Sequence, residues 1–276
     1  MDKTMPCKQI SVAGIQISQV MGNRQANIST AIEAITAAPG HDIYVLPELS
    51  SSGYGINVFQ ALDDLAEDIM GPSFSAFSDL AKKLRCFICY GFPKRSKDGK
   101  FFISTSVVDP NGNLVANYDK WHVCSTGVCC EKDYFSSGKN PLAAFDVNGI
   151  KVGLAICYDI RFPELARKLT VDRKISLLLH PGGWPRDEGF HTWHTFVQVR
   201  AMENSIYIMS PNWAGPDNGS TAFCPPFLDG EKRKLEKLGS TPGVLSGIVD
   251  AHYLKQVRST YPYLTDRNID MYDKNE

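Results

Sequence analysis

Stretches of apolar, β-branched residues alternate along this chain with stretches that have the spacing of amphipathic helices, and this alternation limits the fold more than any other feature. The segments "ISVAGIQIS" (10–18) and "DIYVLPE" (42–48) predict strands, and residues 23–38 between them predict a helix. The same reasoning predicts helices over 73–85, 162–169 and 190–204, and strands over 86–92, 103–109, 113–119, 142–147, 151–157, 175–181, 205–211 and 243–250. A sheet covered by helices fits this order, so we expect an α/β fold.

The chain has 276 residues, of which 43% are apolar, and this is enough to bury a large core in one domain over residues 1–276. No internal repeat of 20–50 residues occurs, which excludes a solenoid. The 29 Lys and Arg residues nearly balance the 30 Asp and Glu residues. We therefore expect no attraction to nucleic acid or to an acidic membrane surface.

The N-terminal stretch has no apolar segment typical of a secretion signal, and no run reaches the roughly 18 apolar residues that a membrane span needs. Eight cysteines with uneven spacing do not resemble a disulfide framework. We expect a cytoplasmic protein with reduced thiols. No glycine-rich phosphate loop and no metal-ligand spacing stands out, so no cofactor and no metal are expected.

The segment "GLAICYDIRFPELAR" places a cysteine where an apolar strand meets the start of a helix. The strand ends at Cys157, and Pro163 and Glu164 are residues favoured in a first helical turn. Backbone N–H groups at such a corner stabilise a thiolate and can also bind an oxyanion. Cys157 is therefore a candidate nucleophile, although a cysteine at a strand end can equally be a small buried apolar residue.

A cysteine nucleophile needs a base, and the sequence offers several residues for that role. Glu48 and Lys120 each follow an apolar strand directly, and strand ends of a helix-covered sheet converge on one edge. Taken singly, each could also be an ordinary solvated charge. Four histidines are further candidates without a diagnostic position: His122, His180, His191 and His194.

Six motifs occur along the chain in a familiar order: "LPELSSSGYG", "YDKWHV", "EKDYFSSG", "GLAICYDIRFPELAR", "VRAMENSIYI" and "DRNIDMY". Through them the chain resembles the nitrilase superfamily of carbon-nitrogen hydrolases over roughly residues 9–272. The resemblance implies a four-layer α-β-β-α sandwich. It also implies a homodimer or a higher homo-oligomer.

The resemblance places the catalytic Glu-Lys-Cys triad of that family on Glu48, Lys120 and Cys157, and its second, positioning glutamate on Glu131. Glu48 would then move the protons, and Lys120 with the backbone N–H of Tyr158 would hold the oxyanion. Glu131 would orient Lys120 or the substrate; the alternative is a loop carboxylate beside Lys132. The implied reaction cleaves a small linear amide through a cysteine thioester and releases ammonia and a carboxylic acid.

Alternatives remain within and outside this chemistry. A nitrilase or an N-carbamoyl amine hydrolase would use the same triad, and a catalytically silent scaffold would keep the fold alone. We favour amides over nitriles because Tyr158 and Asp159 follow the cysteine, as in amidase-like branches. Arg161 could bind a substrate carboxylate or could pair with Asp159 or Glu164.

The chain also departs from the family pattern at two places. Ile103 stands where many members have an asparagine, and residues 214–243 replace the usual motif and turn after Trp213. Within this region, the charged segment 228–243 is expected to be a solvated loop. These departures leave the triad unchanged, but the lining of the pocket, the late hairpin and the substrate cannot be carried over from any one branch of the family.

Overall fold

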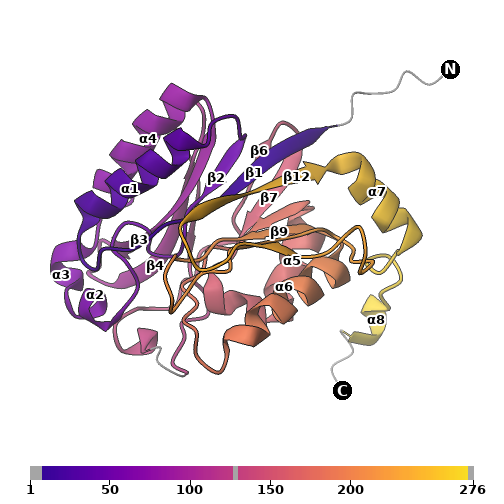
Figure 1. Cartoon of the computed structure of the whole chain (residues 1–276). Coiled ribbons are helices and arrows are strands. Elements are labelled where there is room, and N and C mark those ends of the chain that lie inside the picture. Colours follow the sequence, from indigo (N-terminus) through magenta and orange to yellow (C-terminus); the bar gives the residue numbers. More distant parts are fainter. Residues whose placement is uncertain (1–7, 127–129, 273–276) are drawn as a thin grey trace.

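The computed structural model describes residues 8–126 and 130–272. Two six-stranded sheets pack face to face, and helices cover the outer face of each sheet (Figure 1). Helices α1 and α4 lie on the first sheet, and α5 and α6 lie on the second. The predicted four-layer α-β-β-α sandwich is therefore confirmed.

The first sheet has the strand order β12-β1-β2-β3-β4-β5. Its three central strands run parallel, and the flanking strands pair antiparallel with them. The strands are β1 (Gln9–Gln16), β2 (Ile43–Val45), β3 (Phe87–Arg95), β4 (Phe101–Val108), β5 (Leu114–Asp119) and β12 (Gly243–Asp250).

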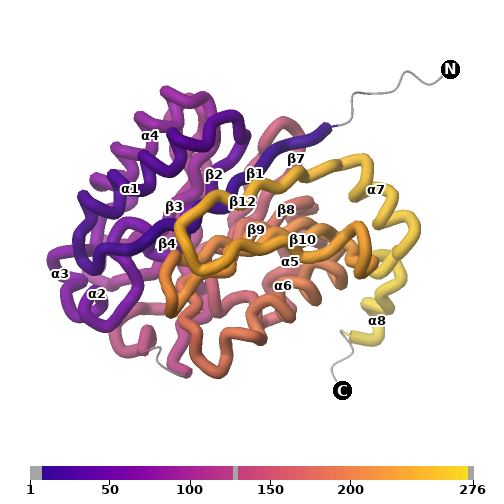
Figure 2. The backbone as a smooth tube through the Cα atoms, in the orientation of Figure 1, coloured from indigo at the N-terminus to yellow at the C-terminus, as the bar shows by residue number. Residues whose placement is uncertain are grey.

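The second sheet has the order β11-β10-β9-β8-β7-β6 and repeats this arrangement, with three parallel strands in the middle. Its strands are β6 (Ala144–Val147), β7 (Ile150–Leu154), β8 (Leu177–Leu179), β9 (Tyr207–Ser210), β10 (Ala222–Cys224) and β11 (Glu236–Lys237). The backbone trace in Figure 2 shows how the two halves of the chain lie against each other.

Local sequence explains where the main helices begin and end. The Asn23 side chain accepts a hydrogen bond from the Ala26 N–H and so caps α1. Proline occupies the first turn of α4 and of α5, where its missing N–H is no loss. The helices are α1 (Arg24–Ala37), α2 (Ile56–Gln60), α3 (Leu62–Leu65), α4 (Pro72–Leu84), α5 (Pro163–Arg173), α6 (Phe190–Asn204), α7 (Ala251–Thr260) and α8 (Ile269–Tyr272).

The core is divided by the first sheet. The larger apolar cluster fills the space between the sheets, where it joins Val12 and Val45 of the first sheet to Leu154 and Leu179 of the second, and it continues under α5 and α6. A smaller cluster lies between the first sheet and its helices, and includes Phe77 of α4. Burial of apolar side chains from both halves holds the two sheets together, and it thereby fixes the edge at which their strand ends meet.

The late part of the chain differs most from the sequence-based expectation. Residues 214–243 contribute two strands, β10 and β11, that extend the second sheet. The segment 228–243 is largely exposed, as expected, but β11 within it pairs with β10. Helix α7 was not expected; it follows β12 directly, because Asp250 ends the strand and caps the helix through the N–H groups of His252 and Tyr253. Over the residues that the model describes, every helix is too short or too polar to cross a membrane.

Gly91 in β3 offers a test of how the first sheet supports the segment around Glu48. A Cβ at this position would lie 2.6 Å from the Leu49 nitrogen and 2.9 Å from the Pro47 carbonyl oxygen. These are backbone atoms that cannot yield as a flexible side chain would. We expect Gly91→Ala to lower the free energy of unfolding by about 1–3 kcal/mol, as other overpacked sites do, measured by urea denaturation.

Gly239→Ala is the matched control, since a Cβ there would meet nothing within 4 Å. We expect it to change the free energy of unfolding by less than about 0.5 kcal/mol. Equal effects of the two substitutions would contradict this account of the packing.

Candidate active site

Four ionisable side chains meet at the carboxyl ends of the strands. Glu48 lies three residues after β2, Lys120 directly after β5, and Cys157 three residues after β7. Glu131 lies in a short 3-10 helix. All four side chains are buried, and Lys120, which has the longest side chain of the four, is only 1% exposed. The structure thus brings together the four side chains that the sequence predicted.

Lys120 is the centre of this group. Its Nζ donates to Glu48 Oε1 at 2.7 Å and to the two oxygens of Glu131 at 2.7 and 2.9 Å. Burial alone would lower the pKa of Lys120, but the Glu131 and Glu48 carboxylates together raise it well above its usual value. Lys120 therefore stays an ammonium ion, and the site has a fixed positive charge.

Glu131 is held by more than the lysine. It accepts hydrogen bonds from the Tyr54 hydroxyl and from the backbone N–H of Cys124, the latter at 2.7 Å. The carboxylate is completely buried. Glu131 is therefore buried in contact with the Lys120 ammonium, although it lies beside Lys132 in sequence.

Glu48 has the electrostatics of a general base. Burial raises its pKa to about 7, with Lys120 opposing and Glu131 adding to the increase. Its Oε1 accepts from Lys120, while Oε2 is buried without a hydrogen-bond partner among the described residues. That oxygen lies 3.2 Å from the position that a Cβ on Gly183 would take. Glu48 therefore keeps one oxygen available for a proton near neutral pH.

The Cys157 thiol is stabilised in its protonated form. Burial and the nearby Glu48 carboxylate raise its pKa, while Lys120 and the Gly183 backbone N–H favour the thiolate. Both the Cys157 thiol and the free oxygen of Glu48 thus lie next to Gly183. Near neutral pH the Cys157 thiol therefore lies beside Glu48, whose carboxylate form can accept the thiol proton.

The segment 181–183 aligns these two residues. The Pro181 carbonyl accepts from the Cys157 N–H at 2.9 Å, and the Gly182 carbonyl accepts from the Glu48 N–H at 3.2 Å. The Trp213 indole N–H also donates to the Glu48 carbonyl, at 3.1 Å. Backbone contacts therefore fix the base and the thiol to the same segment.

Cys157 itself has a left-handed backbone, with φ of 44°. A non-glycine residue adopts this conformation at a cost of about 1–3 kcal/mol, so its surroundings must hold it. His180 Nε2 donates to the Cys157 carbonyl at 2.8 Å, and Ser210 bonds the other ring nitrogen. Burial lowers the pKa of His180 to about 4, so the ring is neutral and acts as a support.

Asp159 links the cysteine turn to the lysine loop. Its buried carboxylate accepts from the Ile156 N–H, the Tyr118 hydroxyl and the N–H and Nδ1 of His122, at 2.7 to 3.0 Å. Tyr118 and His122 flank Lys120 in sequence. Asp159 therefore sets the position of the lysine loop relative to the cysteine turn.

None of the four candidate histidines is placed as a base for the thiol. His180 bonds the Cys157 carbonyl and His122 bonds Asp159. His194 bonds the Ser220 carbonyl, and His191 is exposed on α6. Sequence reasoning missed the supporting contacts of His180, Asp159 and Trp213. Only Asp159 gave a signal in the sequence, because it is a charged residue two positions after the cysteine.

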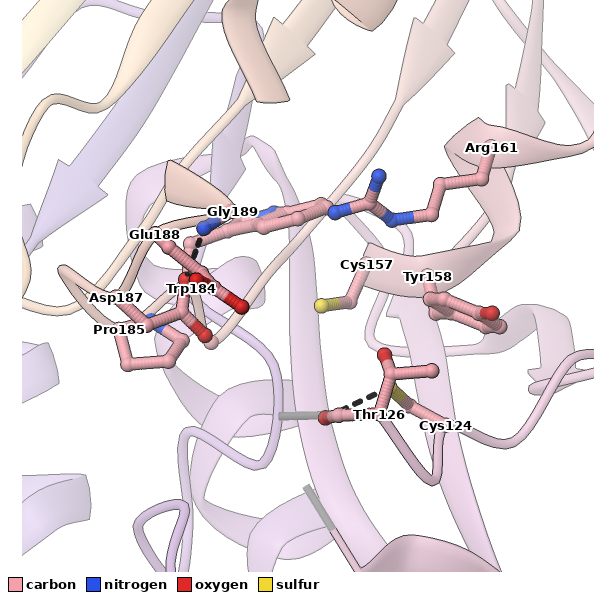
Figure 3. Close-up of a pocket in the computed structure, with 11 residues that line it drawn as sticks. Cys124, Thr126, Cys157, Tyr158, Arg161, Trp184, Pro185, Asp187, Glu188 and Gly189 are labelled. Carbon is pink, nitrogen blue, oxygen red and sulfur yellow. Dashed lines mark hydrogen bonds between the residues drawn. The ribbon is translucent and has the colours of Figure 1, made fainter. Parts of the chain in front are cut away.

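A cavity of about 470 Å³ opens over the Cys157 sulfur (Figure 3). Tyr158 lines one wall and is the second residue of a 3-10 helix, where a backbone N–H has no helical partner. Cys124 also lines the cavity, Cys130 does not, and Cys129 lies outside the described residues.

Neither Ile103 nor any residue of 214–243 lines the cavity. The two departures from the family pattern thus lie away from this cavity, and the Ile103 side chain lies in the core.

Arg161 also lines this cavity. Its guanidinium lies over the rings of Tyr158, Trp184 and Phe196 at 5.8, 5.4 and 5.2 Å. Throughout 8–126 and 130–272 no carboxylate forms an ion pair with it. The predicted alternative of pairing with Asp159 or Glu164 is wrong, because Asp159 is occupied by closer donors.

Across the same described ranges, no group of three His, Cys, Asp or Glu residues could hold a metal ion.

The chain has a buried carboxylate, ammonium and thiol at the strand ends of a double sandwich, and comparison with known proteins assigns it to a class of hydrolases. The chain matches the carbon-nitrogen hydrolase family over residues 11–251, so it belongs to this family. The resemblance inferred from the six motifs is confirmed.

Individual relatives agree with this assignment. A Pseudomonas protegens protein called "Hydrolase in pqqF 5' region" is 32% identical, with 92% of this chain and 86% of that protein covered. The omega-amidase NIT2 of Danio rerio is 29% identical, with 97% of each chain covered. Among solved structures, XC1258 from Xanthomonas campestris has the same fold, with a TM-score of 0.83 at 23% identity over 95% of this chain and 98% of that one.

The shifted pKa of Glu48 predicts how Cys157 reacts with a small neutral thiol reagent, methyl methanethiosulfonate. Glu48 would be about one-tenth deprotonated at pH 6 and about nine-tenths at pH 8. The modification rate of Cys157, followed by peptide mass, should rise about tenfold over this interval and then level off.

Glu48→Gln is the control, because it removes the base and keeps the shape. An unassisted thiol with a raised pKa should react about a hundred times faster at pH 8 than at pH 6, with no plateau. A wild-type profile equal to that of Glu48→Gln would contradict a base of pKa about 7.

Proposed function

We propose that this protein hydrolyses small linear amides through a thioester on Cys157. The observation that carries the proposal is the buried contact of Lys120 with Glu48 and Glu131 beside the Cys157 thiol. The open cavity over that thiol supplies room for a small substrate. An amide carbonyl held there would meet a nucleophile, a base and two oxyanion donors.

The first half-reaction forms the acyl-enzyme. Glu48 takes the thiol proton as the Cys157 sulfur bonds to the carbonyl carbon. The negative oxygen of the tetrahedral intermediate is held by Lys120 and by the Tyr158 N–H, and a single such donor contributes about 3 kcal/mol. Glu48 then returns the proton to the nitrogen, the carbon-nitrogen bond breaks, and ammonia leaves.

The second half-reaction frees the enzyme. Glu48 accepts a proton from water as the water oxygen attacks the thioester carbon. The same donors hold the second oxyanion, and the carbon-sulfur bond breaks as the proton passes back to the Cys157 sulfur. The products are a carboxylic acid and the original thiol, so one water is consumed for each amide.

The relative named an omega-amidase supports an amide as the substrate class. An unpaired Arg161 in the cavity wall supports an amide whose far end carries a carboxylate. Nitrilase or N-carbamoyl amine hydrolase activity would use the same residues. A silent scaffold would have no need for a base with a pKa near 7 beside a buried thiol.

We expect Cys157→Ala to abolish ammonia release while the protein still folds, because Cys124, the other described thiol that lines the cavity, contacts Thr126, and trimming a small side chain costs little. Removal of a covalent nucleophile should lower kcat by at least about a thousandfold. Cys130→Ala is the control, since Cys130 lies outside the cavity lining, and it should keep most activity. More than about one per cent residual activity in Cys157→Ala would refute the nucleophile.

We further expect amides to be better substrates than nitriles of the same chain length. An amide develops an oxyanion for which Lys120 and the Tyr158 N–H are ready donors, whereas a nitrile needs a proton on nitrogen at the thioimidate stage. The comparison is kcat/KM for ammonia release from butanamide and butanenitrile, and from propanamide and propanenitrile. Higher values for both nitriles would replace the amidase assignment by a nitrilase assignment.

We also propose that the chain forms a homodimer or a larger homo-oligomer, as the resemblance implies. Val199 of α6 and Met271 and Tyr272 of α8 are apolar side chains exposed on the surface. Light scattering at micromolar concentration should give a multiple of the 30.6 kDa chain mass. A mass equal to one chain would contradict the proposal.

A further inference from the structure

The active-site cavity has an acidic side that the mechanism does not use. Asp187 and Glu188 lie on the segment between β8 and α6 and line the same cavity as Cys157 and Arg161. Figure 3 shows the Glu188 carboxylate and the Arg161 guanidinium reaching into the cavity from two different sides of the cysteine. The cavity wall therefore carries both signs of charge.

These charges are available to a ligand. Asp187 Oδ1 accepts from the Gly189 N–H at 2.8 Å, which leaves its second oxygen free. Glu188 forms no hydrogen bond or ion pair with any described residue. The neighbouring Arg186 is engaged elsewhere, since it donates to the Asn218 carbonyl at 2.7 Å and lies over the Phe190 ring.

The acidic and basic groups border one small space above Gly189. A Cβ on Gly189 would lie 3.2 Å from Asp187 Oδ1 and 3.6 Å from Arg161 Nη2. Gly189 itself lines the cavity. The Asp187 carboxylate and the Arg161 guanidinium therefore both approach Gly189, and a ligand group lying against this residue would have an anionic acceptor on one side and a cationic donor on the other.

An α-amino acid presents this combination, because its ammonium and carboxylate groups sit on one carbon. The guanidinium of Arg161 matches a carboxylate in geometry, and its position among three aromatic rings holds it in place. Asp187 and Glu188 would accept the ammonium. A ligand that carried a carboxylate but no ammonium would bring its negative charge close to the negative charges of Asp187 and Glu188, with no positive charge to offset them.

We propose that the cavity binds the zwitterionic head group of an α-amino acid whose side chain ends in the amide that Cys157 attacks. The substrate class is thus the ω-amides of α-amino acids, and the products are ammonia and an acidic amino acid. This inference rests on the proposed amidase function. Arg161 takes the carboxylate, Asp187 takes the ammonium, and Glu188 adds to the negative field.

The test compares three matched amides at each of two chain lengths. The five-carbon set is L-glutamine, 5-amino-5-oxopentanoate without the ammonium, and pentanamide without either charge. The four-carbon set is L-asparagine, 4-amino-4-oxobutanoate and butanamide. In at least one set the amino acid should have a kcat/KM about tenfold above that of its deaminated analogue, which corresponds to one well-placed charge contact.

Three substitutions locate this preference in the cavity. Asp187→Asn and Glu188→Gln should each lower the ratio of amino acid to deaminated amide by about fivefold, mainly through KM. Gly189→Ala should also lower that ratio, because its methyl group fills the space; its φ of −82° and ψ of −12° suit alanine. Glu164→Gln is the control for a general charge effect, since Glu164 is exposed on α5 and does not line the cavity.

Two results would overturn the inference while the amidase function stands. The first is a deaminated amide that equals or exceeds its amino acid in both sets. The second is a ratio that Asp187→Asn and Glu188→Gln leave unchanged or that Glu164→Gln lowers equally. Absence of turnover for all six amides, together with no acyl group on Cys157, would instead refute the proposed function and the inference with it.

Discussion

The site depends on one buried ammonium ion held between two carboxylates. Lys120 contacts Glu48 and Glu131 at 2.7 Å in surroundings that solvent does not reach. Removing one partner of such a buried pair typically costs about 3–5 kcal/mol, because the remaining charge is left unpaired. The lysine therefore constrains both carboxylates. The contact with Lys120 occupies one oxygen of Glu48 and leaves the other free, while burial raises the pKa of Glu48 against the opposing effect of Lys120.

The double sheet explains how residues so far apart in sequence reach this contact. Each sheet has three parallel strands at its centre, and their carboxyl ends meet at one edge because the apolar cluster between the sheets fixes the stacking. The segment 181–183 then binds the backbone of Glu48 from one sheet and of Cys157 from the other. The fold places the chemistry through backbone contacts, and side chains such as Asp159 and His180 complete the alignment.

Periodicity predicted the four longest described helices, α1, α4, α5 and α6, and ten of the twelve described strands, because long amphipathic segments and apolar strands fix their own faces. Helix α6 begins and ends where the pattern does. Helix α7 was missed because Asp250 serves both the end of β12 and the helix cap, so no turn residues separate the two elements. The short strands β10 and β11 have only three and two residues, too few for an alternating pattern to stand out.

The candidate site could be predicted in part. The cysteine stands out from its place at a strand-to-helix corner, whereas Glu48, Lys120 and Glu131 were distinguished from ordinary charges only by resemblance to a family. The supporting residues lie beyond local reasoning; the Trp213 indole meets Glu48 across 165 positions of sequence. Arg161 was expected to pair with a neighbour in sequence, but Asp159 turns inward to four other donor atoms.

Acyl transfer to Cys157 is the central claim, and the mass of the enzyme during turnover tests it most directly. Wild type and the slower Glu48→Gln variant are mixed with butanamide, quenched in acid while ammonia is being released, and analysed by intact and peptide mass. The account predicts a butanoyl group on Cys157 in at least one of the two proteins and none in Cys157→Ala. Steady ammonia release by wild type with no acyl group on Cys157 in either protein would contradict it.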